Sequence, residues 1–274
     1  MRYSCLLVLL IFAMQGMAAF EISGMNVFNS GNPARSWAGT NSNSGFINNP
    51  AGITNGRFWS GISYFKPYNL NSLYQASLVV RMPGWKNLNG GVALNSFGNP
   101  LYRETMMCLN VSRSFFRNTF YFGVNLRNYF LTIQNYGGFY SWGIDVGAGY
   151  FLYDPLFISF SVINLNQPVL NGYRHQIPTL ASLGIAFRPG DRVEFTAAVQ
   201  KEEAFPVNVL VGFSFWIDRN FLVQSGFESY PGTPSLGLIL GKGNVRFHYA
   251  LQYHFQLGET HFWGISFGGG NFGH

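Results

Sequence analysis

The feature that most constrains this chain is a recurring alternation of apolar residues with polar or small ones. Its clearest instance is residues 245–255. One face of that segment carries Val245, Phe247, Tyr249, Leu251, Tyr253 and Phe255, and the other carries Arg246, His248, Ala250, Gln252 and His254. Because successive side chains of a β-strand point to opposite faces, this rhythm predicts a strand with one apolar face. Residues 140–152 and 193–200 repeat the pattern, and residues 207–215 repeat it less cleanly.

The alternation recurs along most of the chain and predicts about fourteen strands. They lie near residues 57–65, 73–82, 88–97, 105–115, 119–132, 139–152, 156–163, 179–187, 192–200, 207–217, 221–228, 235–240, 244–256 and 260–268. An even number of strands with an apolar outer face and a polar inner face is typical of a bacterial outer-membrane barrel. We therefore expect an all-β fold, a transmembrane antiparallel β-barrel. A soluble β-sandwich is the alternative, because it also has short strands and glycine-rich turns.

The connections between the predicted strands favour the barrel. Every second connection is tight and polar, as at Arg117-Asn118 and Pro189-Gly190-Asp191, whereas the others are mostly longer, above all residues 164–178. Outer-membrane barrels join their strands by short periplasmic turns and longer external loops. With an even number of strands, both chain ends are then expected in the periplasm.

The composition excludes several other classes of protein. Only 10% of the residues are charged, against roughly 25% in ordinary soluble domains. After residue 20, no stretch approaches the ~18 consecutive apolar residues of a membrane helix. The net charge of +6 comes mostly from single arginines separated by aromatic stretches. Electrostatic capture of a polyanion needs a clustered basic patch, so we expect no nucleic-acid partner.

Residues 1–19 have the layout of a secretory signal peptide. Arg2 precedes an apolar run over residues 5–14, and small residues follow up to Ala18 and Ala19. We expect cleavage after one of these two alanines. Export combined with the barrel pattern predicts an integral protein of the outer membrane.

The rest of the chain divides into three predicted parts. Residues 20–55 are rich in Asn, Ser and Gly, have no strand period, and are predicted to form an N-terminal plug inside the barrel. Residues 56–268 are the predicted barrel, and residues 269–274 are a short C-terminal tail. Removal of the signal peptide leaves Cys108 as the only thiol, so no intramolecular disulfide can form.

Short motifs near both ends of the chain are more specific. They are Ala34-Arg35-Ser36, Gly39 and Asn49-Pro50-Ala51-Gly52-Ile53 ahead of the first strand, and Phe213-Ser214-Phe215-Trp216, Gly226-Phe227, Ser235-Leu236-Gly237, Leu257-Gly258-Glu259-Thr260-His261 and Gly264-Ile265-Ser266-Phe267 towards the C-terminus. On these motifs the chain resembles the FadL-like outer-membrane barrels, and their PorV/PorQ-like branch more than their fatty-acid channels. The resemblance implies a fourteen-stranded barrel with an N-terminal hatch in its lumen. The candidate residues of that plug or hatch motif are Arg35, Asn49, Pro50, Ala51 and Gly52.

The hatch motif also has a physical interpretation of its own. Asn49-Pro50 is a turn-forming pair, and the small Ala51 and Gly52 would let the backbone pass close to the inner wall. An ordinary loop turn is the open alternative.

Six charged residues and histidines are predicted to face the lumen from the wall. They are Arg127, Asp145, Glu194, Arg246, His248 and His254. Charges in a lumen can select a solute or form a gate, but they more often pair with one another, because an unpaired buried charge is costly. Both interpretations stay open. His248 and His254 stand about 20 Å apart at the rise of a strand and cannot hold one metal ion together. We expect no catalytic residue, no metal and no cofactor, and therefore no enzyme.

Three functions fit these observations. The first hypothesis is an accessory component of protein secretion or transport across the outer membrane, as the PorV/PorQ branch implies, with secretion-apparatus or cargo proteins as partners. The alternative is a FadL-like passive channel for hydrophobic small molecules, as the fatty-acid branch implies. The third is a structural envelope barrel whose partner is outer-membrane lipid.

Overall fold

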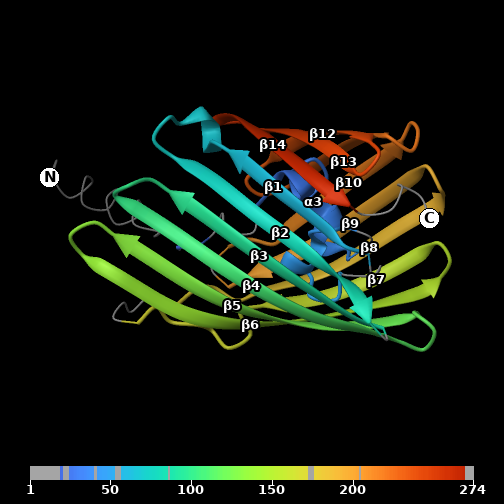
Figure 1. The fold of residues 1–274 in the computed structure, drawn as a ribbon, viewed down its shortest axis with the longest axis horizontal. Helices are drawn as coiled ribbons and strands as arrows, with labels where there is room; N and C mark the ends of the chain where they lie inside the picture. Colours follow the sequence, from blue (N-terminus) through green and yellow to red (C-terminus); the bar gives the residue numbers. More distant parts are fainter. Residues whose placement is uncertain are drawn as a thin grey trace, which may run out of the picture.

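A closed β-barrel with a short helical segment inside it makes up the described part of the chain (Figure 1). The computed structural model describes residues 19–20, 25–39, 42–52, 57–85, 87–171, 176–203 and 205–268. The helices are α2 (Val27–Ser30), α3 (Pro33–Trp37) and the 3-10 turns η1 (Gly45–Ile47) and η2 (Pro67–Asn69). The strands are β1 (Trp59–Phe65), β2 (Tyr74–Trp85), β3 (Leu88–Gly98), β4 (Tyr102–Phe115), β5 (Phe120–Ile133), β6 (Gly137–Tyr153), β7 (Leu156–Ile163), β8 (Leu180–Gly190), β9 (Val193–Glu202), β10 (Asn208–Trp216), β11 (Phe221–Glu228), β12 (Thr233–Lys242), β13 (Val245–His254) and β14 (Gly258–Gly268).

Every strand pairs antiparallel with its neighbours in sequence, and β1 closes the ring against β14. In that closing pair Trp59 lies opposite Gly268, and Phe65 lies opposite Phe262. A sandwich has two separate sheets with open edges, so this single closed ring excludes the alternative fold. The prediction of a fourteen-stranded barrel is confirmed, and each predicted boundary lies within three residues of the observed one.

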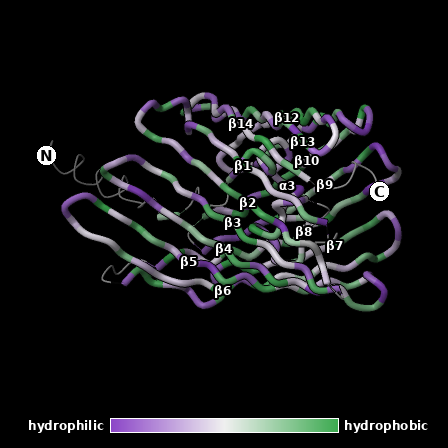
Figure 2. Tube along the Cα trace, viewed as in Figure 1, coloured by the Kyte–Doolittle hydropathy of each residue, from purple (hydrophilic) through white to green (hydrophobic). Residues whose placement is uncertain are grey.

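The two faces of the wall divide as the alternation predicts. On β13, Arg246 and His248 are buried on the inner face, whereas Phe247 and Tyr253 are 40% and 46% exposed on the outer face. Figure 2 shows hydrophobic colours along the middle of the strands and hydrophilic colours at the turns of both ends. An outer surface with this apolar band is stable in hydrocarbon and would aggregate in water, so it identifies a membrane-spanning barrel.

The two ends of the barrel differ in their connections. All the tight connections predicted from the sequence lie at one end, where β1 also begins and β14 also ends. The other end carries residues 66–73 and 164–179 as its longest connections. The connections after β3, β5 and β13 at that end are as tight as those opposite, so the predicted difference in length comes from a few loops only.

The described part of the N-terminal segment lies within the ring of strands. Helix α2 contacts β1, β12, β13 and β14, and α3 contacts the inner side of β7 to β11. Figure 1 shows α3, in blue, enclosed by the wall. No helix in the described ranges is long and apolar enough to span a membrane. The predicted signal peptide before Ala19 and the predicted tail over residues 269–274 lie outside the described residues.

Candidate functional site in the lumen

The Asn49-Pro50-Ala51-Gly52 motif forms a tight turn against the inner wall. The Asn49 side-chain oxygen accepts a hydrogen bond from the Ala51 backbone N–H at 3.0 Å, and the Gly52 N–H donates to the Asn49 carbonyl at 2.8 Å. The wall then holds the turn from outside, because the Asn110 amide of β4 donates to the Pro50 carbonyl at 2.9 Å. The motif therefore makes both a local turn and a contact with the wall.

Two wall glycines make room for this turn. Gly123 of β5 lies directly opposite Gly147 of β6. A Cβ atom at Gly123 would lie 2.1 Å from the Pro50 carbonyl oxygen, and one at Gly147 would lie 2.4 Å from the Asn49 side-chain oxygen. Any larger residue at either position has to displace the turn. These glycines were missed from the sequence, since they look like the other glycines of the strands.

A first buried ion pair joins β5 to β6, and its arginine also bonds the N-terminal segment. The Arg127 guanidinium pairs with the Asp145 carboxylate, and a second guanidinium nitrogen donates to the Ile47 carbonyl of η1. Asp145 also accepts hydrogen bonds from the Asn125 amide at 3.0 Å and from the Asn164 backbone N–H at 2.9 Å. Both charges are shielded from solvent and both are compensated, as buried charges require.

A second buried cluster lies further round the wall. Arg35 of α3 pairs with Glu194 of β9 at 2.8 Å, and Arg188 of β8 pairs with the same carboxylate at 2.9 Å. Both guanidinium groups lie over the Trp216 ring, at 5.4 Å and 5.6 Å from its centroid. Arg35 and Glu194 were both predicted, but as members of different sets. The structure brings them together and adds Arg188 and Trp216.

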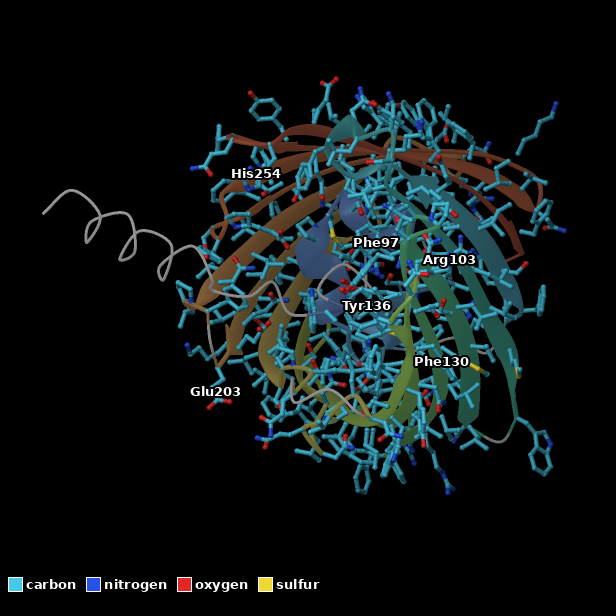
Figure 3. The ribbon with its side chains drawn as sticks, turned by 90° about the vertical axis from the view of Figure 1, so that its left-hand side faces the viewer. Phe97, Arg103, Phe130, Tyr136, Glu203 and His254 are labelled. Atoms are coloured by element: carbon cyan, nitrogen blue, oxygen red, sulfur yellow. The ribbon has the colours of Figure 1, made fainter. Side chains whose placement is uncertain are left out.

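The remaining three predicted residues lie apart from these clusters and from any shared centre. Arg246 donates to the Gly268 carbonyl at 2.8 Å, and the His248 ring hydrogen-bonds the Ser266 hydroxyl at 2.8 Å. His254 lies at the end of the barrel seen in Figure 3, where its ring nitrogen accepts from the backbone N–H groups of the β13–β14 turn. Separate groups that each bond to their own neighbours fit a structural network better than one selectivity site.

A small cavity lies inside the barrel, between the N-terminal segment and the long connection after β7. Its volume is about 130 Å³. Aromatic and aliphatic side chains supply most of its apolar lining: Phe20, Trp37, Tyr129, Ile163, Ile177, Pro178 and Leu180. The Phe20 and Tyr129 rings lie 4.8 Å apart. These residues come from distant segments, and the only sequence signal for the cavity was the unusual length of residues 164–178.

Polar and charged residues complete the lining of this cavity: Asn48, Arg127, Tyr129, Asn164 and Glu202. The Tyr129 hydroxyl donates to the Asn164 side-chain oxygen at 2.7 Å, and the Asn164 amide donates to the Pro178 carbonyl at 3.0 Å. The Asn48 amide donates to the Ser36 hydroxyl at 2.8 Å. A molecule bound here therefore meets apolar side chains together with polar groups, of which Asn48, Tyr129, Asn164 and Arg127 are already bonded within the protein.

Fold and lumen together define a transmembrane β-barrel with an internal segment. No protein-family model matches the sequence, and no curated protein matches it. Among solved structures, the chain is similar to the TodX monoaromatic hydrocarbon channel in its deltaS2 mutant form, with a TM-score of 0.69 and 10% identity over 91% of this chain and 99% of that one. It is also similar to the Ralstonia pickettii toluene transporter TbuX, with a TM-score of 0.61 and 11% identity over 93% and 100% of the two chains. A Pseudomonas aeruginosa FadL homologue matches with a TM-score of 0.59 and 12% identity over 89% and 98%.

These likenesses show that the chain has the FadL-like barrel fold. The predicted resemblance to the FadL-like barrels is thereby confirmed at the level of the fold. Its narrower form, the PorV/PorQ branch, receives no support from these structures, which are channels and transporters.

Proposed function

We propose that this protein is a passive outer-membrane channel for small hydrophobic molecules. The observation that carries the proposal is the cavity inside the barrel, where aromatic and aliphatic side chains of the N-terminal segment, the inner wall and the connection after β7 lie together. This was the alternative hypothesis from the sequence. The similar structures include a hydrocarbon channel and a toluene transporter, which favours it over the secretion hypothesis.

The cavity points to a ligand of about one aromatic ring. An engineered apolar cavity of ~150 Å³ binds benzene and excludes water, and the volume here, about 130 Å³, is close to that. The bonded state of Tyr129, Asn164 and Asn48 favours a neutral ligand, because a charged one would be desolvated without new partners. We therefore propose neutral monocyclic hydrocarbons as the substrate class.

In this proposal residues 20–55 act as a plug that separates the cavity from the periplasm. Support comes from the turn at Asn49 and Pro50 packed on the wall, from the ion pair that joins Arg35 to the wall, and from the hydrogen bond that Arg127 donates to the Ile47 carbonyl. Passage of a ligand then needs a local displacement of the segment, not an unfolding of the barrel. We propose that the barrel lies in the outer membrane with the start of β1 and the end of β14 on the periplasmic side.

Uptake of toluene by cells tests the proposal. Ile163→Trp would fill the cavity from the end of β7, where Ile163 is buried. Val162→Trp puts the same side chain on the outer face of the same strand and serves as the control. We expect Ile163→Trp to lower toluene uptake to the level of a deletion strain, and Val162→Trp to leave it unchanged.

Gel mobility before and after heating shows that both variants fold, since only an intact barrel migrates differently when unheated. Equal uptake by the wild type and the deletion strain would contradict the channel. If deletion instead abolished the export of a surface protein, the secretion hypothesis would replace it.

A further inference from the structure

A row of small side chains crosses the outer face of the wall. Thr105 of β4 pairs with Ser96 of β3, and Ser96 pairs with Ala76 of β2. All three side chains point outward, by the alternation of their strands. The row continues to Tyr64 of β1 and Trp263 of β14, which are large. The side chains therefore project little from the outer surface over β2 to β4 and project further at β1 and β14.

This difference in height makes a groove of about 660 Å³ on the outer surface. Leu78 and Leu94, one row nearer the tight-turn end, form its other border. The volume falls within the ~300–1,000 Å³ of small-molecule sites. Because its lining is almost wholly apolar and faces the membrane, the groove suits a hydrocarbon chain.

A positively charged side chain, Arg103, lies at the edge of the groove nearest the long-loop end. Arg103 is the next outward residue after Thr105 on β4 and is labelled at that end in Figure 3. Its guanidinium donates to the Tyr74 hydroxyl at 2.8 Å. Gly98 pairs with both Arg103 and Tyr74, so a residue without a side chain lies between them. Its φ is +126°, and a Cβ there would lie 2.0 Å from the Tyr102 carbonyl, so a larger residue would not fit.

The charge of Arg103 is available to a partner outside the protein. Arg103 is exposed, and none of the ion pairs among the described residues involves it. A guanidinium has five N–H donors and forms strong, charge-assisted bonds with phosphate. The Tyr74 hydroxyl, which accepts from Arg103, can donate its own proton to the same anion.

We propose that this groove binds one anionic, phosphate-bearing lipid from the surrounding membrane. Its acyl chain lies over Ala76, Ser96 and Thr105, and its phosphate bonds Arg103 and the Tyr74 hydroxyl. The argument for this occupant is complementarity: an apolar groove for the chain, with an uncompensated positive charge at the level of the headgroup. The site lies outside the lumen and is independent of the proposed transport function.

Native mass spectrometry of the purified full chain in detergent tests the site, with phosphatidylglycerol and phosphatidylcholine as the added lipids. Arg103→Gln removes the charge, and Ser96→Leu fills the groove with a side chain that hydrocarbon tolerates. Arg113→Gln is the matched control, because Arg113 lies on the same strand and face at the opposite end, over the Phe115 ring. Heat-dependent gel mobility checks that each variant folds.

We expect the wild type and Arg113→Gln to retain one phosphatidylglycerol. Retention by Arg103→Gln and by Ser96→Leu should fall about tenfold, the factor for the loss of one charge-assisted hydrogen bond or of a comparable apolar contact. Equal retention of the two lipids by the wild type would overturn the proposal. So would an equal loss in Arg113→Gln and Arg103→Gln, undiminished retention in Ser96→Leu, or full displacement of the lipid by inorganic phosphate.

Discussion

Replacing Asp145 by Asn isolates the energetic role of the Arg127–Asp145 ion pair. The substitution is nearly isosteric and keeps an oxygen that can accept from the Asn164 N–H, but it removes the charge and replaces the second carboxylate oxygen, which accepts from Arg127 and Asn125, by an NH2 donor. Arg127 is 4% exposed, and its guanidinium would remain buried without a counter-charge. Breaking a buried pair costs about 3–5 kcal/mol, and we expect about 3 kcal/mol here because the hydrogen bond to Asn164 survives.

The double variant separates charge from packing. Arg127→Met combined with Asp145→Asn leaves no charge at the site, so its loss of stability should be smaller than that of Asp145→Asn alone. Asp191→Asn, in the exposed turn between β8 and β9, is the control and should change stability by no more than about 0.5 kcal/mol. Denaturant unfolding in lipid vesicles, followed by tryptophan fluorescence, gives the free energy of unfolding of all four proteins.

The result also tests whether the lumen is filled as the structure shows. If Asp145→Asn lowered stability by less than about 1 kcal/mol, the value typical of solvent-exposed pairs, the pair would have to be hydrated. That outcome would mean that η1 does not cover Arg127, and it would refute the proposed plug together with the energetic argument.

Two further predictions follow from the wall. Gly123→Ala should displace the turn at Pro50 and raise ion conductance in planar bilayers. Gly190→Ala, where a new Cβ meets nothing within 4 Å, is the control and should leave conductance unchanged. Equal conductance of the two variants would contradict the close contact between Gly123 and the turn. Phe247→Arg, on the outer face of β13, should destabilise the barrel by about 2–4 kcal/mol if it faces the middle of the membrane. Lys242→Arg, at the tight-turn end, should leave stability unchanged, and unfolding measurements that show no difference between these two variants would refute the assignment of the outer face.

The strands could be predicted because their signal is local. Whether Phe247 faces out and His248 faces in depends only on the period of two along one strand, and lipid on one side makes that period strict. The tight turns could be predicted for the same reason, since Pro189-Gly190-Asp191 contains its own turn residues. The lengths of the loops at the other end of the barrel were predicted less well. The alternation within the strands is the same whether the loop between them has three residues or more.

The contacts inside the barrel could not be predicted in this way. Arg35 and Glu194 were each recognised as candidates, yet nothing in the intervening sequence indicates that they meet. Their contact depends on where α3 lies within the closed ring. Trp216, which both Arg35 and Arg188 cover, belongs to one of the C-terminal motifs, but nothing in that motif indicates these two partners. The narrower resemblance, to the PorV/PorQ branch, stays a prediction, since short terminal motifs are compatible with several barrels of one fold.

The sequence by itself therefore determined the architecture: about fourteen strands, an apolar outside and a polar inside. Each of these follows from neighbouring residues and from the solvent on either side of the wall. Only the tertiary structure decided what the barrel contains and what its outer surface offers. Strand register and ring closure place residues side by side that are far apart in the chain. They produce the ion pairs, the space that Gly123 and Gly147 leave for the turn at Pro50, the cavity and the outer groove.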